Sequence, residues 1–259
     1  MWSVIEAPKL DNNQRAFVKH IKSKKEMLLS CLDMDQVLKA TAYRDIERAV
    51  GSLAIEGTHV SEEDMTTICY DGVPMSIRKL NVLMEAVNMH KAIDTMYDFI
   101  YSGVDFSEDV LLKFHSIFSN NLLDLDNSGR YRNCMVSIGK CNYQVAQINQ
   151  IGKLMKELFR QLELIDDPIV KATFFSYTMV CIHPFKDFNG RTSRLCEGYI
   201  LLSNGYPVPT ITPEERANYI KLISSGSYSG TKFNWEYTKW IGEKVMGTID
   251  SMLSCNPEY

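Results

Sequence analysis

The chain has 259 residues, of which 45% are hydrophobic and 23% are charged, as in an ordinary globular protein with a sizeable core. A net charge of −4 disfavours nucleic acid as a partner, and no apolar run is long enough to predict a membrane span. Seven cysteines without a CxxC pair or zinc-ligand spacing, together with the lack of a signal-peptide pattern, predict a reducing, cytoplasmic setting.

Helical periodicity dominates the chain. Apolar residues three and four apart predict amphipathic helices over residues 12–32 and 35–56, and Gly57 is typical of the position that follows a helix. Ser61 followed by Asp64 is the N-cap pattern of a short helix. The same periodicity predicts helices over residues 77–101, 107–120, 148–164, 167–181, 189–203, 213–224 and 234–253.

Residues 121–147 interrupt this rhythm. Alternation around Met135 and Val145, with Gly139 near the centre, predicts a short two-stranded hairpin. Cys134 and Cys141 flank this hairpin, so a cross-strand disulfide is an option.

The domain organisation predicted from these elements is simple. The sequence contains no repeat, low-complexity run or clear linker, so we expect an all-α fold in one compact unit. Within it, residues 1–60 are expected to form N-terminal helices that pack on residues 61–259.

The densest polar segment is IHPFKDFNGRTSR, residues 182–194, which separates two predicted helices. Asn189 and Gly190 stand at the start of the second helix, where unpaired backbone N–H groups attract anions. Arg191 and Arg194 are three residues apart, hence neighbours on the first turn, and a guanidinium can bind two phosphate oxygens at once. The pattern therefore indicates a phosphate site.

Two further residues of this segment add chemistry. Asp187 supplies an oxygen ligand of the kind that Mg²⁺ prefers, and His183 is a base whose ordinary pKa lies near neutrality. Each residue alone also suits a plainer role, at a helix end, in a turn or on a solvated face. A zinc site is disfavoured, since no second His has the His-Glu-x-x-His spacing, and a Gly-rich P-loop is absent. The order and tight spacing favour a polyphosphate site with a metal and a base.

The segment HPFKDFNGRTSR, residues 183–194, resembles the signature of the Fic family, His-Pro-Phe-x-Asp/Glu-Gly-Asn-Gly-Arg-x-x-Arg. Phe188 stands where the family has a glycine. GRYR, residues 129–132, followed by the predicted hairpin, is similar to the segment that leads into the family's flap. The resemblance spans roughly residues 52–224.

The resemblance implies an all-α Fic fold, a helical bundle with a small β-hairpin flap over residues 134–146 that aligns the target segment. It also implies an enzyme that transfers AMP from ATP to a Ser, Thr or Tyr hydroxyl of a protein. In that chemistry His183 would deprotonate the hydroxyl, Asp187 would hold Mg²⁺, and Arg194 would reach the γ-phosphate. The nucleotide-binding residues it implies are Phe185, Lys186, Asp187, Asn189, Gly190, Arg191 and Arg194.

A second segment, SLAIEG at residues 52–57, resembles the family's inhibitory motif, Ser/Thr-x-x-x-Glu-Gly/Asn. The resemblance implies that Glu56 pairs with Arg194 and keeps the γ-phosphate from binding productively. Ser52 is four residues earlier and so shares a helix face with Glu56. The plainer alternative is a helix end with a surface glutamate and a glycine cap.

Phe188 leaves the nucleotide open, because a ring at that position could alter the loop or cover one side of the phosphates. The alternatives are transfer of a different nucleotide or phosphate-containing group, and a catalytically weak Fic-like interaction module. The partner we expect is a protein substrate, with self-modification and a homodimer as options, and with neither nucleic acid nor a membrane.

Overall fold

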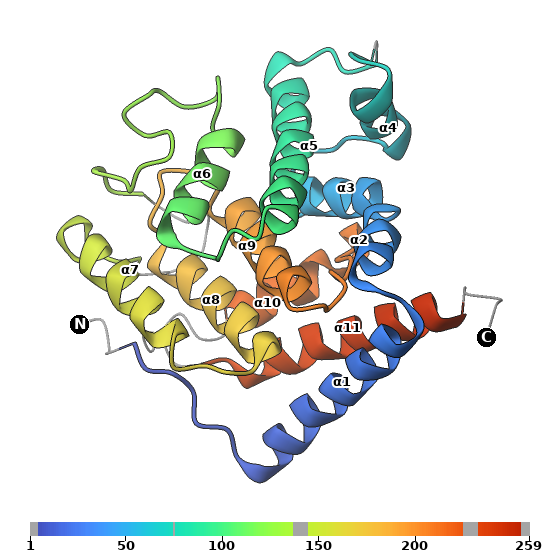
Figure 1. The fold of residues 1–259 in the computed structure, drawn as a ribbon. Helices are drawn as coiled ribbons and strands as arrows, with labels where there is room; N and C mark the ends of the chain where they lie inside the picture. Colours follow the sequence, from blue (N-terminus) through green and yellow to red (C-terminus); the bar gives the residue numbers. More distant parts are fainter. Residues whose placement is uncertain (1–4, 75, 137–144, 225–232, 255–259) are drawn as a thin grey trace.

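The structure of the protein is a computed structural model that describes residues 5–74, 76–136, 145–224 and 233–254. These residues form helices and include no β-strand, so the all-α prediction is confirmed (Figure 1). The helices are α1 (Asn12–Cys31), α2 (Met34–Ala42), α3 (Asp45–Ile55), α4 (Glu62–Tyr70), α5 (Leu80–Tyr101), α6 (Glu108–Phe118), α7 (Ile148–Leu162), α8 (Pro168–Ile182), α9 (Asn189–Ser203), the 3₁₀ helix η1 (Pro213–Glu215), α10 (Arg216–Ser224) and α11 (Trp235–Ser254). Within the described ranges, no helix combines the length and apolar character that a membrane span requires.

Short polar side chains set the helix starts. The side chains of Asp11 and Asp33 each accept a hydrogen bond from the backbone N–H of the third residue of α1 and α2. That residue is a glutamine, and its side chain accepts a hydrogen bond from the backbone N–H of the aspartate, which completes a capping box. Ser61 and Ser107 cap α4 and α6 in the simpler way. These boundaries are local, which is why the sequence pattern predicts them well.

The prediction of one helix over residues 35–56 is wrong. The chain bends at Tyr43 and Arg44, so that α2 and α3 run in different directions (Figure 1). Both helices bury an apolar face, so the hydrophobic periodicity runs through the bend without a break. The bend allows α3 to leave α2 and lie against α5 and α9.

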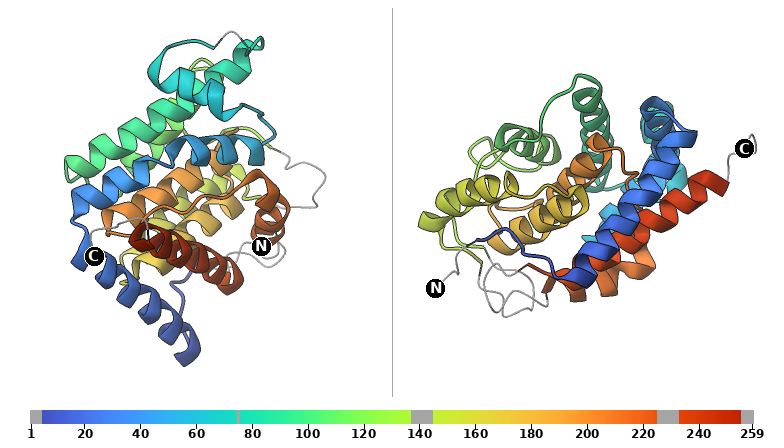
Figure 2. Two further views of the ribbon diagram at one scale, coloured as in Figure 1. Left: turned by 90° about the vertical axis from the view of Figure 1, so that its right-hand side faces the viewer. Right: turned by 60° about the horizontal axis from the view of Figure 1, so that its bottom comes forward.

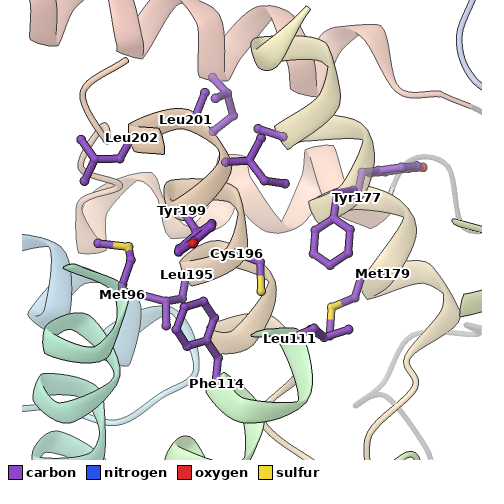
Figure 3. Packing of buried hydrophobic residues seen from close by; sticks show 14 of the residues in the cluster. Met96, Leu111, Phe114, Tyr177, Met179, Leu195, Cys196, Tyr199, Leu201 and Leu202 are labelled. Carbon is purple, nitrogen blue, oxygen red and sulfur yellow. The ribbon is translucent and has the colours of Figure 1, made fainter. Parts of the chain in front are cut away.

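The core is built around the antiparallel pair α8 and α9. Nearly every side chain of α8 is buried, which identifies it as a central helix that its neighbours cover on all sides. Figure 3 shows Met96 of α5 and Phe114 of α6 converging on Tyr199 and Cys196 of α9, with Tyr177 of α8 beyond them. The rigid α8–α9 pair holds both ends of the loop that contains residues 183–188.

The first and last described helices lie together. In Figures 1 and 2, α1 runs alongside α11, below the α8–α9 pair. Gly242 allows this approach, because a Cβ atom there would lie 2.7 Å from Ile21 Cδ1 and 2.8 Å from Phe17 Cε1. Phe17 also packs edge-on against Trp235, with ring centroids 5.6 Å apart.

The hairpin predicted over residues 134–146 falls mainly on residues 137–144, which lie outside the described residues. Its described ends, 134–136 and 145–146, contain no strand. Cys134 is a free thiol, and Cys141 lies outside the described residues.

Gly51 fixes how closely α3 approaches the rest of the fold. A Cβ atom at Gly51 would lie 2.2 Å from the carbonyl oxygen of Ile211, which is backbone and has little freedom to move. We therefore expect Gly51→Ala to lower the free energy of unfolding by about 1–3 kcal/mol through overpacking. The matched control is Gly247→Ala in α11, where a Cβ atom would meet nothing within 4 Å; it should raise stability by about 0.5–1 kcal/mol. Urea unfolding measures both, and equal effects of the two variants would contradict the close approach of α3.

Candidate functional site

The loop between α8 and α9 is bounded by two residues with left-handed backbone. His183, which caps the end of α8, has φ 55° and ψ 60°, and Phe188, which precedes α9, has φ 60° and ψ 10°. This conformation is unfavourable by about 1–2 kcal/mol for each residue that has a Cβ atom. Such a loop persists only where surrounding contacts hold it.

Asn189 and Arg132 supply these contacts. The side-chain amide of Asn189 accepts a hydrogen bond from Phe185 N and donates one to Phe185 O, both at 2.9 Å. Arg132 lies beside the loop, where its Nε donates to His183 O and its backbone N donates to Pro184 O, each at 2.8 Å. The side chain of Asn189 is thus used to close the loop, which leaves its backbone N–H at the start of α9.

His115 of α6 supports the loop from below. Its Nδ1 accepts a hydrogen bond from Gly129 N at 3.0 Å, so Nε2 carries the proton and donates to Asp187 O at 3.2 Å. The imidazole stacks on the Phe185 ring with centroids 3.8 Å apart. Burial lowers the pKa of His115 to about 4, so the side chain is neutral at pH 7.

His183 is half-buried, and its Nδ1 donates to Val180 O at 3.4 Å, which leaves Nε2 as the proton acceptor. Burial lowers its pKa to about 4, and the charge of Arg132 acts in the same direction. Glu56 and Asp187 raise the pKa but by less. The expectation of an ordinary, near-neutral pKa is therefore wrong, because the pattern of residues does not show how far the imidazole is desolvated. At pH 7 it is a neutral base.

A carboxylate lies at the start of α9. Glu56 Oε1 is 2.9 Å from Arg194 Nη2, and a Cβ atom built on Gly190 would lie only 2.1 Å from the same oxygen. Arg194 also donates from Nε to Ser52 Oγ and from Nη2 to Ser52 O, both at 3.0 Å. The carboxylate therefore occupies a place where backbone N–H groups and a guanidinium favour an anion.

The charge of Glu56 is stabilised at this position. Burial raises its pKa, but the positive charges of Arg194 and Arg191 and the hydrogen bond from Arg194 outweigh that effect, so the pKa lies below its usual value. Arg194 is further held by Tyr219 of α10, whose hydroxyl lies 3.3 Å from Nη1. Its Cζ lies 5.4 Å from the centroid of the same ring. Glu56 is ionised at neutral pH and Arg194 is fixed in place.

Arg191 lies on the same first turn of α9. Its Nη1 is 2.5 Å from Glu85 Oε2 of α5, and its Nη2 is 3.8 Å from Asp187 Oδ1. Its Cζ lies 4.2 Å from the centroid of the Phe188 ring, a cation–π contact. Phe188 is only 5% exposed, so the ring lies beneath Arg191, and the backbone of this residue adopts the left-handed conformation that glycine reaches more easily.

The remaining residues of the predicted set, Phe185, Lys186 and Asp187, differ in how far their side chains are exposed. The Phe185 ring is fully buried against His115, so a side-chain role in nucleotide binding is not supported. Lys186 is exposed and lies 3.3 Å from Asp124 Oδ2. Asp187 is exposed at the rim, and its Oδ1 accepts from Phe188 N at 2.6 Å.

The two ends of the segment 134–146 are attached to the same loop through Arg132. Its Nη1 donates to Cys134 O at 3.0 Å and its Nη2 to Ala146 O at 2.5 Å. Because Arg132 Nε also donates to His183 O, one buried side chain fixes the segment's described ends relative to His183.

A metal, if bound here, has one protein carboxylate at hand. The described residues contain no group of three or more His, Cys, Asp or Glu side chains that could hold a metal ion. The side chain of Asp187 is 62% exposed and beside the anion position. This arrangement suits Mg²⁺, which is commonly held by one or two carboxylates together with substrate phosphates.

Several residues of the site escaped the sequence analysis: Glu85, His115, Tyr219 and the buried role of Arg132. They come from α5, α6, α10 and the segment that follows α6. No sequence motif relates their positions to residues 182–194. Only GRYR, which contains Arg132, carried a signal.

The sequence of the chain is similar to known proteins. Residues 105–201 match the Fic/DOC family model. Protein adenylyltransferase fic-1 of Caenorhabditis briggsae is 27% identical over 172 residues, which cover 65% of this chain and 34% of that protein. Protein adenylyltransferase Fic of Nematostella vectensis is 22% identical over 268 residues, 97% of this chain and 59% of that protein. The chain thus spans between about a third and three fifths of these curated relatives.

Solved structures share the fold. A Fic domain containing signaling protein from Bacteroides thetaiotaomicron superposes with a TM-score of 0.76 at 18% identity, over 90% of this chain and 94% of that one. Fic-1 from Caenorhabditis elegans superposes with a TM-score of 0.77 at 19% identity, over 93% of this chain and 72% of that one. The likeness establishes the fold of the chain.

The buried His115 makes stability depend on pH. With a pKa of about 4 in place of 6.5, the folded state binds fewer protons than the unfolded state between these values. The free energy of unfolding should therefore fall as the pH drops through this window, by about 2 kcal/mol from pH 7 to pH 5 for this side chain. Urea unfolding of wild type and His115→Gln at both pH values measures the difference in slope. Equal pH dependence of the two proteins would contradict a neutral, buried His115.

Proposed function

The chain carries a Fic/DOC domain within a Fic-type fold, and from this premise we propose that it is a self-inhibited protein adenylyltransferase. It would transfer AMP from ATP to a hydroxyl side chain of a target protein. The observation that carries the proposal is the helix start at α9, where two arginines and a neutral histidine surround a position taken by a carboxylate. The names of the curated relatives support the same activity.

The proposed reaction uses the geometry of the loop directly. Nε2 of His183 accepts the proton of the attacking Ser, Thr or Tyr hydroxyl. The hydroxyl oxygen forms a bond to the α-phosphorus of ATP as the bond to the bridging oxygen breaks, so that pyrophosphate leaves with its electron pair. Backbone N–H groups at the start of α9, with Arg191 and Arg194, offset the negative charge of the phosphates.

Asp187 is the residue that we propose for holding Mg²⁺, and Mg²⁺ bound with ATP would neutralise phosphate charge and orient the leaving group. Arg191 lies between Asp187 and Glu85, so it fixes the metal side of the pocket relative to α5. Gly190 leaves room for an oxygen against the backbone, as the close approach of Glu56 demonstrates.

We propose that the segment 134–146 aligns the target by main-chain hydrogen bonds, a form of strand addition. Arg132 supports this role, since it holds the segment's described ends to the loop that contains His183. Modification of a second copy of the chain, and assembly as a homodimer, belong to the same proposal. The cysteine pattern favours a reducing, cytoplasmic setting.

The position of Glu56 supports the proposed self-inhibition. Its carboxylate takes the anion position and one side of the Arg194 guanidinium, and these are the groups that a γ-phosphate would use. Productive ATP binding must therefore displace Glu56. In this proposal residues 1–60 regulate residues 61–259 within one unit, and Ser52 holds Arg194 in the orientation that suits Glu56.

Removing the carboxylate should activate the protein. Glu56→Gly removes a charge-assisted hydrogen bond of about 1.5–3 kcal/mol that competes with the γ-phosphate, so transfer should rise about 10- to 100-fold. The measurement is incorporation of label from α-labelled ATP with Mg²⁺. Glu163→Gly is the matched control, since Glu163 caps the end of α7 as Glu56 caps the end of α3. Equal transfer by wild type and Glu56→Gly would contradict self-inhibition.

The base is tested at His183. His183→Ala in the Glu56→Gly protein should lower transfer by about 10²–10⁴-fold.

The metal is tested at Asp187. Asp187→Asn keeps the size and one acceptor oxygen but removes the charge that holds Mg²⁺, so transfer in the Glu56→Gly protein should fall at least about tenfold. The Asp187 carboxylate is exposed, so folding should be unchanged by circular dichroism. If Asp187→Asn retains full transfer across a Mg²⁺ titration, Asp187 stabilises the turn and does not hold the metal.

A further inference from the structure

One carboxylate oxygen joins Arg191 to the turn that follows α3. Oε2 of Glu85 accepts a hydrogen bond from Arg191 Nη1 at 2.5 Å and another from the hydroxyl of Thr58. The side chains are largely enclosed, with Glu85 15% exposed and Arg191 7% exposed. Glu85 lies in the second turn of α5, far from the α9 loop in sequence.

Thr58 belongs to the turn that carries Glu56. Its backbone N donates to Leu53 O at 3.0 Å, so the residues after α3 fold back on the helix end and place Thr58 two residues beyond the carboxylate that binds Arg194. The hydroxyl of Thr58 therefore attaches this turn to α5, and the same oxygen of Glu85 attaches α5 to Arg191.

Arg191 depends strongly on this carboxylate. Its side chain is buried, and its Nε has no hydrogen-bond partner within the ranges that the structure describes. Asp187 is 3.8 Å away and exposed, and the Phe188 ring contacts only the face of the guanidinium. Glu85 is thus the one close carboxylate in the described structure that sets the direction of Nη1.

We propose that Glu85 is a positioning residue that aims Arg191 at the phosphates and, through Thr58, ties this arginine to the turn that carries Glu56. The proposal rests on the proposed function, which it deepens by adding a residue outside the α9 loop. Loss of Glu85 weakens nucleotide binding through Arg191. Loss of the Thr58 hydroxyl instead frees the inhibitory turn, so the two changes act in opposite directions.

The first test is a double-mutant cycle in the Glu56→Gly protein, with Glu85→Gln and Arg191→Gln. Calorimetric titration with ATP and Mg²⁺ should show that Glu85→Gln weakens binding about tenfold, and that adding it to Arg191→Gln causes no further loss. Glu85→Asp, which keeps the charge, should recover part of the affinity. Losses that multiply in the double variant would overturn the proposal. Melting curves establish that each variant is folded, and the shorter Glu85→Asp provides a second readout if the glutamine variant is not.

The second test uses the hydroxyl of Thr58. In the protein that retains Glu56, Thr58→Val should raise transfer about two- to tenfold, the range expected for one hydrogen bond. In the Glu56→Gly protein it should have no effect, since no carboxylate remains to be released. Thr95→Val is the control, because that hydroxyl bonds only Lys91 O within α5. An increase in both backgrounds, or in neither, would overturn the link through Thr58.

The outcomes distinguish failure of the role of Glu85 from failure of the proposed function. If the Glu56→Gly protein neither binds ATP nor transfers AMP, the proposed function fails and the role of Glu85 fails with it. If that protein binds ATP and transfers AMP while Glu85 and Arg191 act independently, the function stands and the role of Glu85 alone is wrong.

Discussion

The contact between Glu56 and Arg194 is the interaction on which the rest of the site depends. An ionised carboxylate and a buried guanidinium meet at the start of α9, where the backbone also favours negative charge. Burying the Arg194 guanidinium without a counter-charge would be unfavourable, and the position of α3 lets the partly exposed Glu56 supply that charge. The bend between α2 and α3 and the bare backbone of Gly51 and Gly190 serve this approach.

The loop that carries His183 obeys a different constraint, because its shape is unfavourable by itself. Two residues with left-handed backbone are held by partners from outside the loop, Arg132 and His115, and by Asn189 from within. His115 can support the loop from a buried position because its lowered pKa keeps it neutral at pH 7. A charged imidazole there would cost the free energy of desolvation. The position of His183 therefore depends on side chains that have no part in the proposed reaction.

The sequence was informative wherever a property is local. Helix starts followed from capping residues such as Asp11 and Ser61, and the fold class followed from periodicity. The motif residues identified the helix start, and Ser52 and Glu56, predicted from a separate motif, lie against Arg194. What could not be predicted depends on distant parts of the chain meeting: Glu85 on Arg191, Tyr219 on Arg194, and the desolvation that lowers the His183 pKa. The sequence did not show the effect of the Phe188 ring. The ring packs beneath Arg191, and this contact arises only in the folded chain.

The pairing of α1 with α11 has a consequence for how the protein is made. α1 is synthesised well before α11, and its buried residues Val18, Ile21 and Leu28 lie on the helix that has α11 as its main partner among the described helices. About 200 residues separate the two helices, so at about 5–20 residues per second the wait lasts roughly 10–40 s. During that interval the nascent chain presents an uncovered hydrophobic stripe, the kind of surface that chaperones bind. Synthesis speed and chaperone supply should thus influence the yield of folded protein.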